Sequence, residues 1–552
     1  MRRLYAIVAI MIMILASCSD DYLFENPPNS ITTKSLYSSI EGFETGINGL
    51  YSRVRYEFQW ISSISLLPAN LYLVGTDNYA AQTGSAFMQI SRDWGDVNNS
   101  QVSDYENIFL WLYSVINAAN TIINQAESRD DINWFGGNYS ADENKNRSIA
   151  EAKAIRAWAY RHLSYGWGDV PLSLNESLGS TIKTDWERTP VKLVRKQIIS
   201  DLLFAQKYLD DSPKVRGRIS KGAAQHYLAE MYITLDMPDS TLYWTNQVIS
   251  NSNYKLITER YGVKADQPGV PFMDMFYDGN TNREEGNTEA LWVWQYQYGV
   301  TGGAGSFLRY LYGSRYWAIT VNGVTPLQIS FDRGGRPMSY ASLTRWAWEN
   351  YEPQDDRGSQ HVIRKYFILK EDNGELSKAD LLPSGYNYGD TIWLDTSGDI
   401  TTNQAAQRYS WPFCRKFLGS SPVSLTDTYE YVDKIYLRLA ETYLLKAEAQ
   451  FMLGSNQEAA NTINILRRRS NASDITSDNI NMDFILDERS RELLQEEHRR
   501  YTLLRTGKWL ERVKKYNKRG GEFITDRDLL FPIPESVINT NLTKEMPQNP
   551  GF

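Results

Sequence analysis

Apolar residues recur every three or four positions through much of the first half of this chain. In residues 103–127, the apolar positions that share one helical face are Ile108, Leu112, Val115, Ala119 and Ile122. This spacing is typical of an amphipathic α-helix, so we predict one helix across the segment. The same pattern predicts helices over residues 147–165, 189–209, 220–235 and 239–250, and Gly166 with Gly168 ends the first of these.

Two predicted helix pairs have a similar composition although they lie far apart in the sequence. The first pair is 220–235 with 239–250, and the second is 436–453 with 457–469. Alanines alternate with tyrosine and leucine in both pairs, which lets antiparallel helices pack closely, as in tetratricopeptide-type repeats. We therefore expect a scaffold of scattered helix pairs. Residues 484–516 are predicted to form a last long helical region with a solvated, partly paired charged face.

The middle of the chain, residues 261–428, has a different pattern. Helical periodicity largely fails there, glycine, proline, asparagine and aspartate become frequent, and residues 299–305 are glycine-rich. Aromatic residues exceed their overall 13% in residues 276–351. Because long loops often carry function and bury few rings, we expect some of these rings to be exposed. Trp292 and Trp294 alternate with apolar neighbours, which predicts a core strand instead.

The N-terminal sequence indicates an export signal. Arg2 and Arg3 precede an apolar stretch from residue 4 to residue 15, and Leu-Ala-Ser-Cys18 follows. The stretch is too short to cross a bilayer, which takes about 20 residues, but it suits a cleaved signal. The ending resembles a bacterial lipobox, so we predict that Cys18 is lipidated and begins the mature chain. An ordinary signal peptide with a chance cysteine is the alternative.

Charge and missing motifs narrow the possible functions. The formal net charge is −8, and no run of lysine or arginine forms a stripe, which argues against nucleic acid as a partner. The sequence has four histidines but no His-Glu-x-x-His, Cys-x-x-Cys, Gly-x-Ser-x-Gly or Walker motif, so we expect no metal, cofactor or catalytic residue. A glycosidase carboxylate pair drawn from distant residues stays open. With Cys18 lipidated, Cys414 has no disulfide partner.

Ordered sequence blocks resemble the SusD/RagB family of Bacteroidetes outer-membrane lipoproteins. One block ends in Tyr165-Gly166-Trp167-Gly168-Asp169-Val170-Pro171, with the tryptophan inserted into the usual motif. The blocks are 151–160, 165–172, 219–224, 436–449, 486–493 with 504–508, 530–534 and 548–552. Residues 494–500 depart from the family pattern. The resemblance implies ion pairs between helices for Arg489, Arg491 and Glu492.

The resemblance implies a mainly α, SusD-like fold in which tetratricopeptide-type helix pairs form a scaffold with a large irregular loop-rich insertion. We expect a signal peptide at residues 1–17 and an acylated cysteine with its tether at 18–35. A single domain then spans 36–552. Its scaffold would comprise residues 36–260 and 429–552, and its ligand-binding region residues 261–428.

Function is also implied by the resemblance. Family members sit on the outer face of the outer membrane, capture a nutrient, most often an oligosaccharide, and deliver it to a SusC-like TonB-dependent barrel without covalent chemistry. A peptide-binding lid and a surface glycan hydrolase are the alternatives.

The ligand contacts are predicted from residue chemistry and position. Asp77, Asn78 and Trp94 lie in polar segments before the first long helix. Tyr296, Tyr316 and Trp317 lie in the aromatic middle, beside the glycine-rich loop. Tyrosine and tryptophan offer an apolar face with a polar edge, which suits a sugar ring and its hydroxyls. Core packing is the alternative for every one of these rings.

Overall fold

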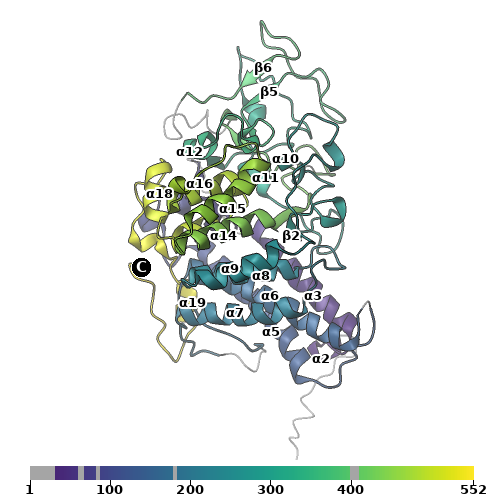
Figure 1. Ribbon diagram of the computed structural model, residues 1–552, viewed down its shortest axis with the longest axis vertical. Helices are drawn as coiled ribbons and strands as arrows, with labels where there is room; N and C mark the ends of the chain where they lie inside the picture. The colour runs from purple at the N-terminus through teal and green to yellow at the C-terminus, as the bar shows by residue number, and fades with distance from the viewer. Residues whose placement is uncertain are drawn as a thin grey trace, which may run out of the picture.

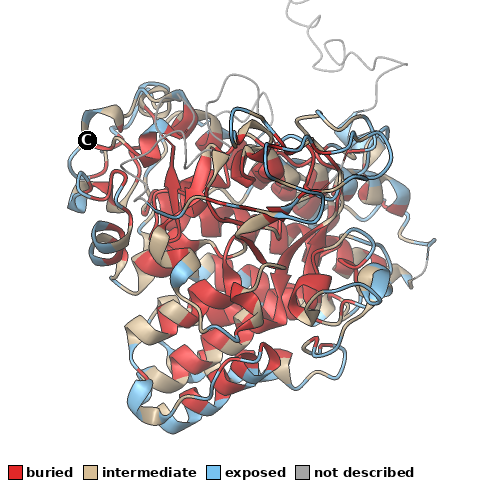
Figure 2. Cartoon of the chain, turned by 90° about the horizontal axis from the view of Figure 1, so that it is seen from above, coloured by how far each residue is buried: buried red, intermediate tan, exposed pale blue. Residues whose placement is uncertain are grey.

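The computed structural model describes residues 32–59, 68–82, 88–137, 139–177, 183–397, 409–419 and 421–552. The predicted signal segment, Cys18 and the tether as far as residue 31 lie outside the described residues. The chain is mainly helical, as predicted, and its buried residues fill the centre of the molecule while exposed residues cover the periphery (Figure 2).

The first half builds a layer of long helices. The central one, α6 (Ala141–Gly166), packs against α5 (Ser103–Ser128) and α7 (Val191–Tyr208). It begins six residues before the predicted start because Ser140 and Glu143 form a capping box. The remaining elements of this half are α2 (Thr33–Leu36), α3 (Ile40–Val54), η2 (Arg55–Phe58), α4 (Asn70–Leu73), β1 (Tyr79–Ala81), η3 (Gln89–Ser91) and η4 (Gly95–Val97).

The two predicted helix pairs lie side by side in space. They are α8 (Lys221–Thr234) with α9 (Pro238–Ile249), and α14 (Leu439–Met452) with α15 (Asn456–Arg469). Helix α14 packs against α9 as well as against α15 (Figure 1). Small side chains at these contacts, such as Ala447 and Ala459, are fully buried. The scattered pairs therefore join into one continuous scaffold.

The predicted helical region 484–516 is three helices, not one. They are α16 (Met482–Leu493), α17 (Arg499–Arg505) and α18 (Trp509–Tyr516). Gln495 and Gly507 both have positive φ, at 74° and 68°, which interrupts the right-handed helix at each place. The remaining C-terminal elements are η10 (Ser477–Asn479), η11 (Asp526–Leu529) and α19 (Glu535–Asn539).

The loop-rich insertion contains short elements in place of long helices, as predicted. The β5–β6 pair lies at the end of the molecule opposite α2 (Figure 1). The elements are η6 (Gly262–Lys264), α10 (Pro271–Asp274), η7 (Arg283–Glu285), β2 (Ala290–Trp294), α11 (Leu308–Tyr312), η8 (Tyr316–Ala318), β3 (Ala341–Leu343), α12 (Arg345–Glu349), η9 (Asp356–Gly358), β4 (Ile363–Arg364), β5 (Tyr366–Ile368), β6 (Thr391–Trp393) and β7 (Phe413–Cys414).

Short antiparallel strand pairs tie the insertion to the scaffold. Strand β2 pairs with β8 (Lys434–Arg438), which runs directly into α14, and β1 pairs with β3. Every residue of β2 is buried, which confirms the core strand predicted at Trp292 and Trp294. The other pairs are β4–β7 and β5–β6. We propose from these pairings that residues 36–552 form one domain.

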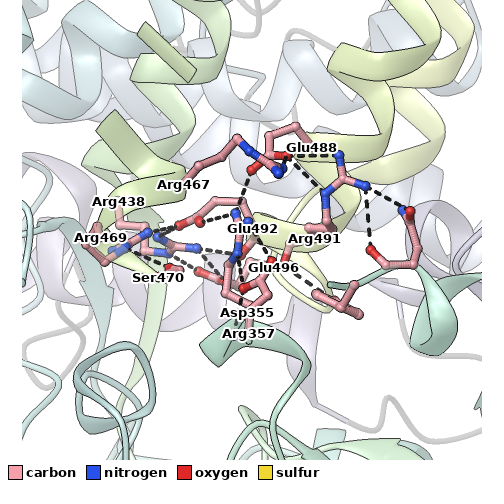
Figure 3. Close-up of polar contacts among 12 residues, drawn as sticks. Asp355, Arg357, Arg438, Arg467, Arg469, Ser470, Glu488, Arg491, Glu492 and Glu496 are labelled. Atoms are coloured by element: carbon pink, nitrogen blue, oxygen red, sulfur yellow. Dashed lines mark hydrogen bonds and ion pairs between the residues drawn. The ribbon is translucent and has the colours of Figure 1, made fainter. Parts of the chain in front are cut away.

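Four charged residues of α16 are buried in ion pairs, namely Arg489 and, shown in Figure 3, Glu488, Arg491 and Glu492. The predicted solvated face is therefore wrong at these positions, whereas Asp487 is half-buried. Glu492 contacts Arg438 of β8 at 2.6 Å and also pairs with Arg469 of α15. Burial alone would raise the pKa of Glu488, but Arg357, Arg491 and Arg467 lower it to about 2.

The ion pairs to other elements implied for Arg489 and Glu492 are confirmed, because Arg489 reaches Glu441 of α14 at 2.8 Å and Glu492 pairs with Arg469 of α15. Arg491 instead pairs with Glu488 of its own helix at 2.9 Å. The network joins α16 to η9, β8 and α15.

Candidate functional site

The polar side chains predicted to contact a ligand form hydrogen bonds with other side chains of the protein instead. Asp77 is fully buried, and its carboxylate accepts hydrogen bonds from Arg499 at 2.7 and 2.8 Å and from Arg512 at 2.7 Å. Burial alone would raise the pKa of Asp77, but the two guanidinium groups lower it below its usual value. The side-chain oxygen of Asn78 accepts from Ser490 at 2.6 Å. Both side chains therefore hold α16, α17 and α18 against the segment before β1.

Three of the predicted rings also belong to the core. Trp94 is 3% exposed and meets Trp509 at a centroid distance of 5.4 Å. Tyr296 is buried in the main core, and Tyr316 donates a hydrogen bond to the carbonyl of Gly335 at 2.7 Å. A buried ring offers no face to a ligand in this conformation. The core-packing alternative therefore fits Trp94, Tyr296 and Tyr316, as it fits Asp77 and Asn78, better than ligand contact does.

Trp317 differs from the other candidates because it is half-buried. Its indole nitrogen donates to the carbonyl of Pro337 at 3.0 Å, and the guanidinium groups of Arg315 and Arg336 lie 4.4 and 4.9 Å from its ring centre. These contacts fix the orientation of the ring at the surface. Ligand contact by Trp317 stays a prediction.

A row of partly exposed tyrosines lies beside the glycine-rich loop. We call it the tyrosine surface, and its members are Tyr298, Tyr310, Tyr340, Tyr429 and Tyr431. Tyr298 is 55% exposed, and its ring meets that of Tyr431 at 5.3 Å. The buried ring of Phe307 contacts Tyr429 at 5.5 Å and Tyr310 at 4.7 Å, and Tyr310 contacts Tyr340 at 6.0 Å. The rings thus form two contact series, which meet on either side of Gly305 at Tyr429 and Tyr431.

Local backbone structure explains why the tyrosines face outward. In the extended segment before β8, half-buried Tyr429 and Tyr431 alternate with buried Glu430 and Val432, as side chains do in a strand. Ser306 and Glu430 exchange backbone hydrogen bonds of 2.8 and 2.9 Å, which holds the glycine-rich loop against this segment. The loop passes between the tyrosines at Gly305.

A β-carbon at Gly305 would lie 2.9 Å from the β-carbon of Tyr429 and 3.0 Å from the ring of Tyr431. Only glycine therefore lets the loop approach Tyr429 and Tyr431 this closely at residue 305.

Polar groups accompany these rings. The backbone N–H of Tyr429 donates to Asp427 at 3.2 Å, and Gln297 next to Tyr298 is exposed. Burial and the nearby Asp427 carboxylate raise the pKa of Tyr429 and of Tyr431 above the usual value, so both phenols stay neutral at physiological pH. A neutral phenol both donates and accepts hydrogen bonds. The surface thus combines flat apolar faces with hydroxyl edges.

One cluster in the described part of the chain has the residue types of a metal site. Glu57, His162 and His498 each place a possible ligand atom within 4.8 Å of the others. However, Arg161 donates to Nδ1 of His498 at 2.9 Å, which leaves the ring proton on Nε2, directed at Tyr436 and Glu57. A metal ion would need the lone pair at that Nε2 atom. The hydrogen bonds therefore favour a buried polar network over a metal site.

Cys414, His162 and His226 are buried and His498 is half-buried, and their pKa values are shifted away from those of a reactive thiol or base. Burial raises the pKa of the Cys414 thiol to about 11 and lowers that of His226 to about 3. Burial also lowers the pKa of His162 and His498 well below the usual value. Neutral histidines locked by hydrogen bonds to Tyr501 and Arg161 serve the packing of α6 against α17.

Two family models match the chain. The model described as "SusD family" matches residues 288–552, and the model described as "Starch-binding associating with outer membrane" matches residues 63–233. The chain belongs to the SusD family. This confirms the SusD/RagB resemblance and the SusD-like fold. Among the described helices, none is both long enough and apolar enough to cross a membrane.

Relatives extend the match along the whole chain. SusD-like protein P2 of Formosa agariphila is 26% identical over 568 residues, covering 98% of each chain. The Starch-binding protein SusD of Bacteroides thetaiotaomicron is 34% identical over 129 residues, which is 23% of this chain and 22% of that one. A solved Laminarin binding SusD-like protein superposes with a TM-score of 0.67 at 20% identity, covering 93% of this chain and 99% of that chain.

Sequence reasoning missed the residues of the tyrosine surface. It chose Tyr296, whereas Tyr298, two residues further from the buried strand β2, is the exposed ring. The alternation begun at Trp292 and Trp294 continues through Tyr296, and that signal could have excluded this ring. Tyr429 and Tyr431 lie just outside the predicted ligand-binding region of 261–428. Only the pairing of residue 306 with residue 430 brings them to the glycine-rich loop.

Proposed function

We propose that this protein binds carbohydrate chains on the tyrosine surface and delivers them, without chemical change, to a SusC-like TonB-dependent transporter. The observation that carries the proposal is the group of partly exposed tyrosines that gathers around Gly305. A sugar ring presents apolar C–H faces that stack on aromatic rings, while its hydroxyls pair with polar groups at the ring edges.

The arrangement of the rings favours a chain of sugars over a single sugar. Tyr298 and Tyr431 lie on one side of Gly305, and Tyr310 with Tyr340 lies beyond Phe307. Successive rings let successive sugar units stack, so that weak contacts add along the chain. Trp317 adds a further ring to the same region. Its indole nitrogen donates to the carbonyl of Pro337, and the residues that follow, Met338 and Tyr340, donate backbone hydrogen bonds to α11, which carries Tyr310.

The relatives support the same class of ligand. Two similar proteins are named as binding starch and laminarin, and the family that matches residues 63–233 is named for starch binding in association with the outer membrane. Lipidation at Cys18 and a position on the outer face are part of the proposal. The anchor would keep the binding surface beside the transporter.

Titration of the mature chain against a panel of polysaccharides and peptides tests the function. The panel should include starch, laminarin and unrelated plant and algal glycans, with tripeptides to decapeptides as the second class. Saturable binding of a glycan, with the glycan recovered intact by chromatography, supports the proposal. Peptide binding alone would favour the peptide-binding alternative, and release of shorter saccharides would favour a hydrolase.

The anchor needs its own test in cells. We expect a Cys18→Ala variant to fold and bind the same ligand but to leave the membrane fraction. Retention of the variant in the membrane of cells that lack the partner transporter would contradict lipid anchoring at Cys18.

A further inference from the structure

A cavity of about 350 Å³ lies between loops of the insertion and the segment before β8. We call it the basic cavity. Its lining residues include Lys264, Tyr277, Phe331, Asp332, Arg415 and Val432. Val432 is buried, whereas its neighbour Tyr431 belongs to the tyrosine surface, so the two features lie on opposite sides of the segment before β8.

Two arginines near this cavity have no acidic partner among the described residues. Arg364 lies opposite Phe413 in the β4–β7 pair, and Arg415 follows two residues after Phe413, so both side chains leave the same face of the ladder. Arg364 is 9% exposed and, within the described chain, makes no hydrogen bond or ion pair. Its guanidinium lies 5.0 Å from the ring centre of Phe367.

The guanidinium of Arg415 also makes few hydrogen bonds. Among the described residues, its side chain makes one long hydrogen bond, of 3.4 Å, from Nη1 to the carbonyl of Gln360, and its Nε has no acceptor. Arg415 is half-buried, whereas Arg364 is buried, and a buried guanidinium without an acceptor is costly because its desolvation is not compensated. An anion in the adjoining cavity would supply the missing acceptors.

The neighbouring charges leave a local positive excess. Lys264 lies 4.4 Å above the ring of Tyr277 and has no ion pair among the described residues. Asp332 is already paired with Lys370 at 2.9 Å, and Asp278 is the other acidic residue of the lining. Nearby, Arg260 pairs with Asp274 and Arg333 pairs with Asp380. His361, Lys434 and Glu285 are further titratable groups in the surroundings.

Ionisation shifts agree with this reading of the charges. Burial and then Arg415 lower the pKa of Arg364 to about 9, and the same two causes lower that of Lys264. Burial would raise the pKa of Asp332, but Lys370, Arg364 and Arg415 lower it to about 2. This coupling places Arg364 close to an acid that lines the cavity. The cations here repel one another in a chain whose net charge is −8.

We propose that the basic cavity binds an oxyanion, held by Arg415 and Lys264 with Arg364 behind them. Sulfate, phosphate and carboxylate groups share the required chemistry, since each presents several acceptor oxygens to guanidinium donors. The source is either a free ion or the acidic substituent of a saccharide. The proposal does not depend on sugar binding at the tyrosine surface.

Thermal unfolding and calorimetric titration of the mature chain with sodium sulfate and sodium phosphate test the site. Sulfate also stabilises proteins generally, so sodium chloride at matched ionic strength and an Arg468→Gln variant serve as controls. Arg468 is exposed and paired with Asp474, far from the cavity in sequence. We expect wild type and Arg468→Gln to show the same saturable rise in Tm with sulfate or phosphate.

The cavity variants should respond differently. We expect Arg415→Gln and Lys264→Met to bind the anion at least tenfold more weakly. Arg364→Gln should do the same, while matching or exceeding the wild-type Tm in chloride, because an uncompensated guanidinium is removed. If Arg364→Gln fails to fold, the other two variants decide. An unsaturable response in wild type, or an unchanged affinity in all folded cavity variants, would overturn the proposal.

Competition identifies the source of the anion. A uronate or sulfated oligosaccharide that displaces sulfate, where a neutral one does not, would support a saccharide substituent as the ligand. Binding of inorganic anions alone would support a free ion at the same site. A Tyr429→Ala/Tyr431→Ala variant should keep the sulfate response, which separates this proposal from the one on carbohydrate binding.

Discussion

Asp77 and Arg499 form a buried ion pair with two hydrogen bonds, across 422 positions of the chain. Arg512 donates a third hydrogen bond to the same carboxylate. The pair fastens α17 and α18 to the segment that leads into β1, and it accounts for a residue that the sequence suggested as a ligand contact. Loss of the carboxylate would leave two guanidinium groups buried without it.

We therefore expect Asp77→Asn to lower the free energy of unfolding by about 3–5 kcal/mol at pH 7, the usual cost of breaking a buried pair. The folded pKa of Asp77 is below the unfolded value, so the carboxylate stabilises the fold above about pH 4 and this contribution is lost as pH falls further. Denaturant unfolding at pH 7 and pH 3 should show the gap between variant and wild type shrinking in acid. A constant gap would contradict this role.

Trp94 gives a second test of core packing against ligand contact. Its ring fills a cluster with Trp509, Leu486 and Leu503. We expect Trp94→Ala to cost about 3–5 kcal/mol of unfolding free energy by leaving a cavity, and Trp94→Phe to cost less. Urea unfolding measures both. A stable Trp94→Ala variant with weakened glycan binding would restore the ligand-contact hypothesis.

The buried carboxyl of Glu57 should make stability depend on pH. Burial raises its pKa well above the usual value, against the hydrogen bond from Tyr436. Its stabilising contribution is therefore present below the unfolded pKa of about 4.3 and is lost as pH rises. Glu57→Gln should become more stable relative to wild type between pH 5 and pH 8. Measurement of the Tm of both proteins across this range tests the prediction. A Tm difference between variant and wild type that does not change with pH would show that Glu57 is already ionised.

The thiol of Cys414 should be inert in the folded protein. It is 1% exposed, and burial raises its pKa to about 11, whereas reaction with a disulfide reagent needs an accessible thiolate. In a Cys18→Ser chain at pH 8, we expect negligible labelling over an hour and one thiol labelled after denaturation. Rapid labelling of the native chain would mean that β7 opens readily from β4.

Much of the scaffold was predictable because helix periodicity is a local property. Helix α5 was predicted at residues 103–127 and spans Ser103–Ser128, and α15 was predicted one residue short. The break between α16 and α17 was missed because it depends on a positive φ at Gln495, a residue type that does not favour one. The burial of Glu488 and Glu492 depends on arginines from three other segments, which no local pattern reveals.

The candidate site was predictable as a region but not as residues. Composition placed exposed aromatic rings beside the glycine-rich loop, and the tyrosine surface lies there. Which rings face outward depends on contacts between distant segments, such as residue 306 with residue 430. Tyr296 and Tyr298 have the same chemistry, but Tyr296 packs into the main core whereas the exposed ring of Tyr298 contacts Tyr431.

Comparison of three chains in one glycan titration tests the central claim most directly. The chains are wild type, Tyr429→Ala/Tyr431→Ala and the matched control Tyr243→Ala, whose exposed ring lies on α9 in the scaffold. We predict unchanged Tm in all three and at least tenfold weaker glycan binding, about 1.4 kcal/mol, in the double variant alone. Equal affinity in the double variant and wild type would contradict carbohydrate binding on the tyrosine surface.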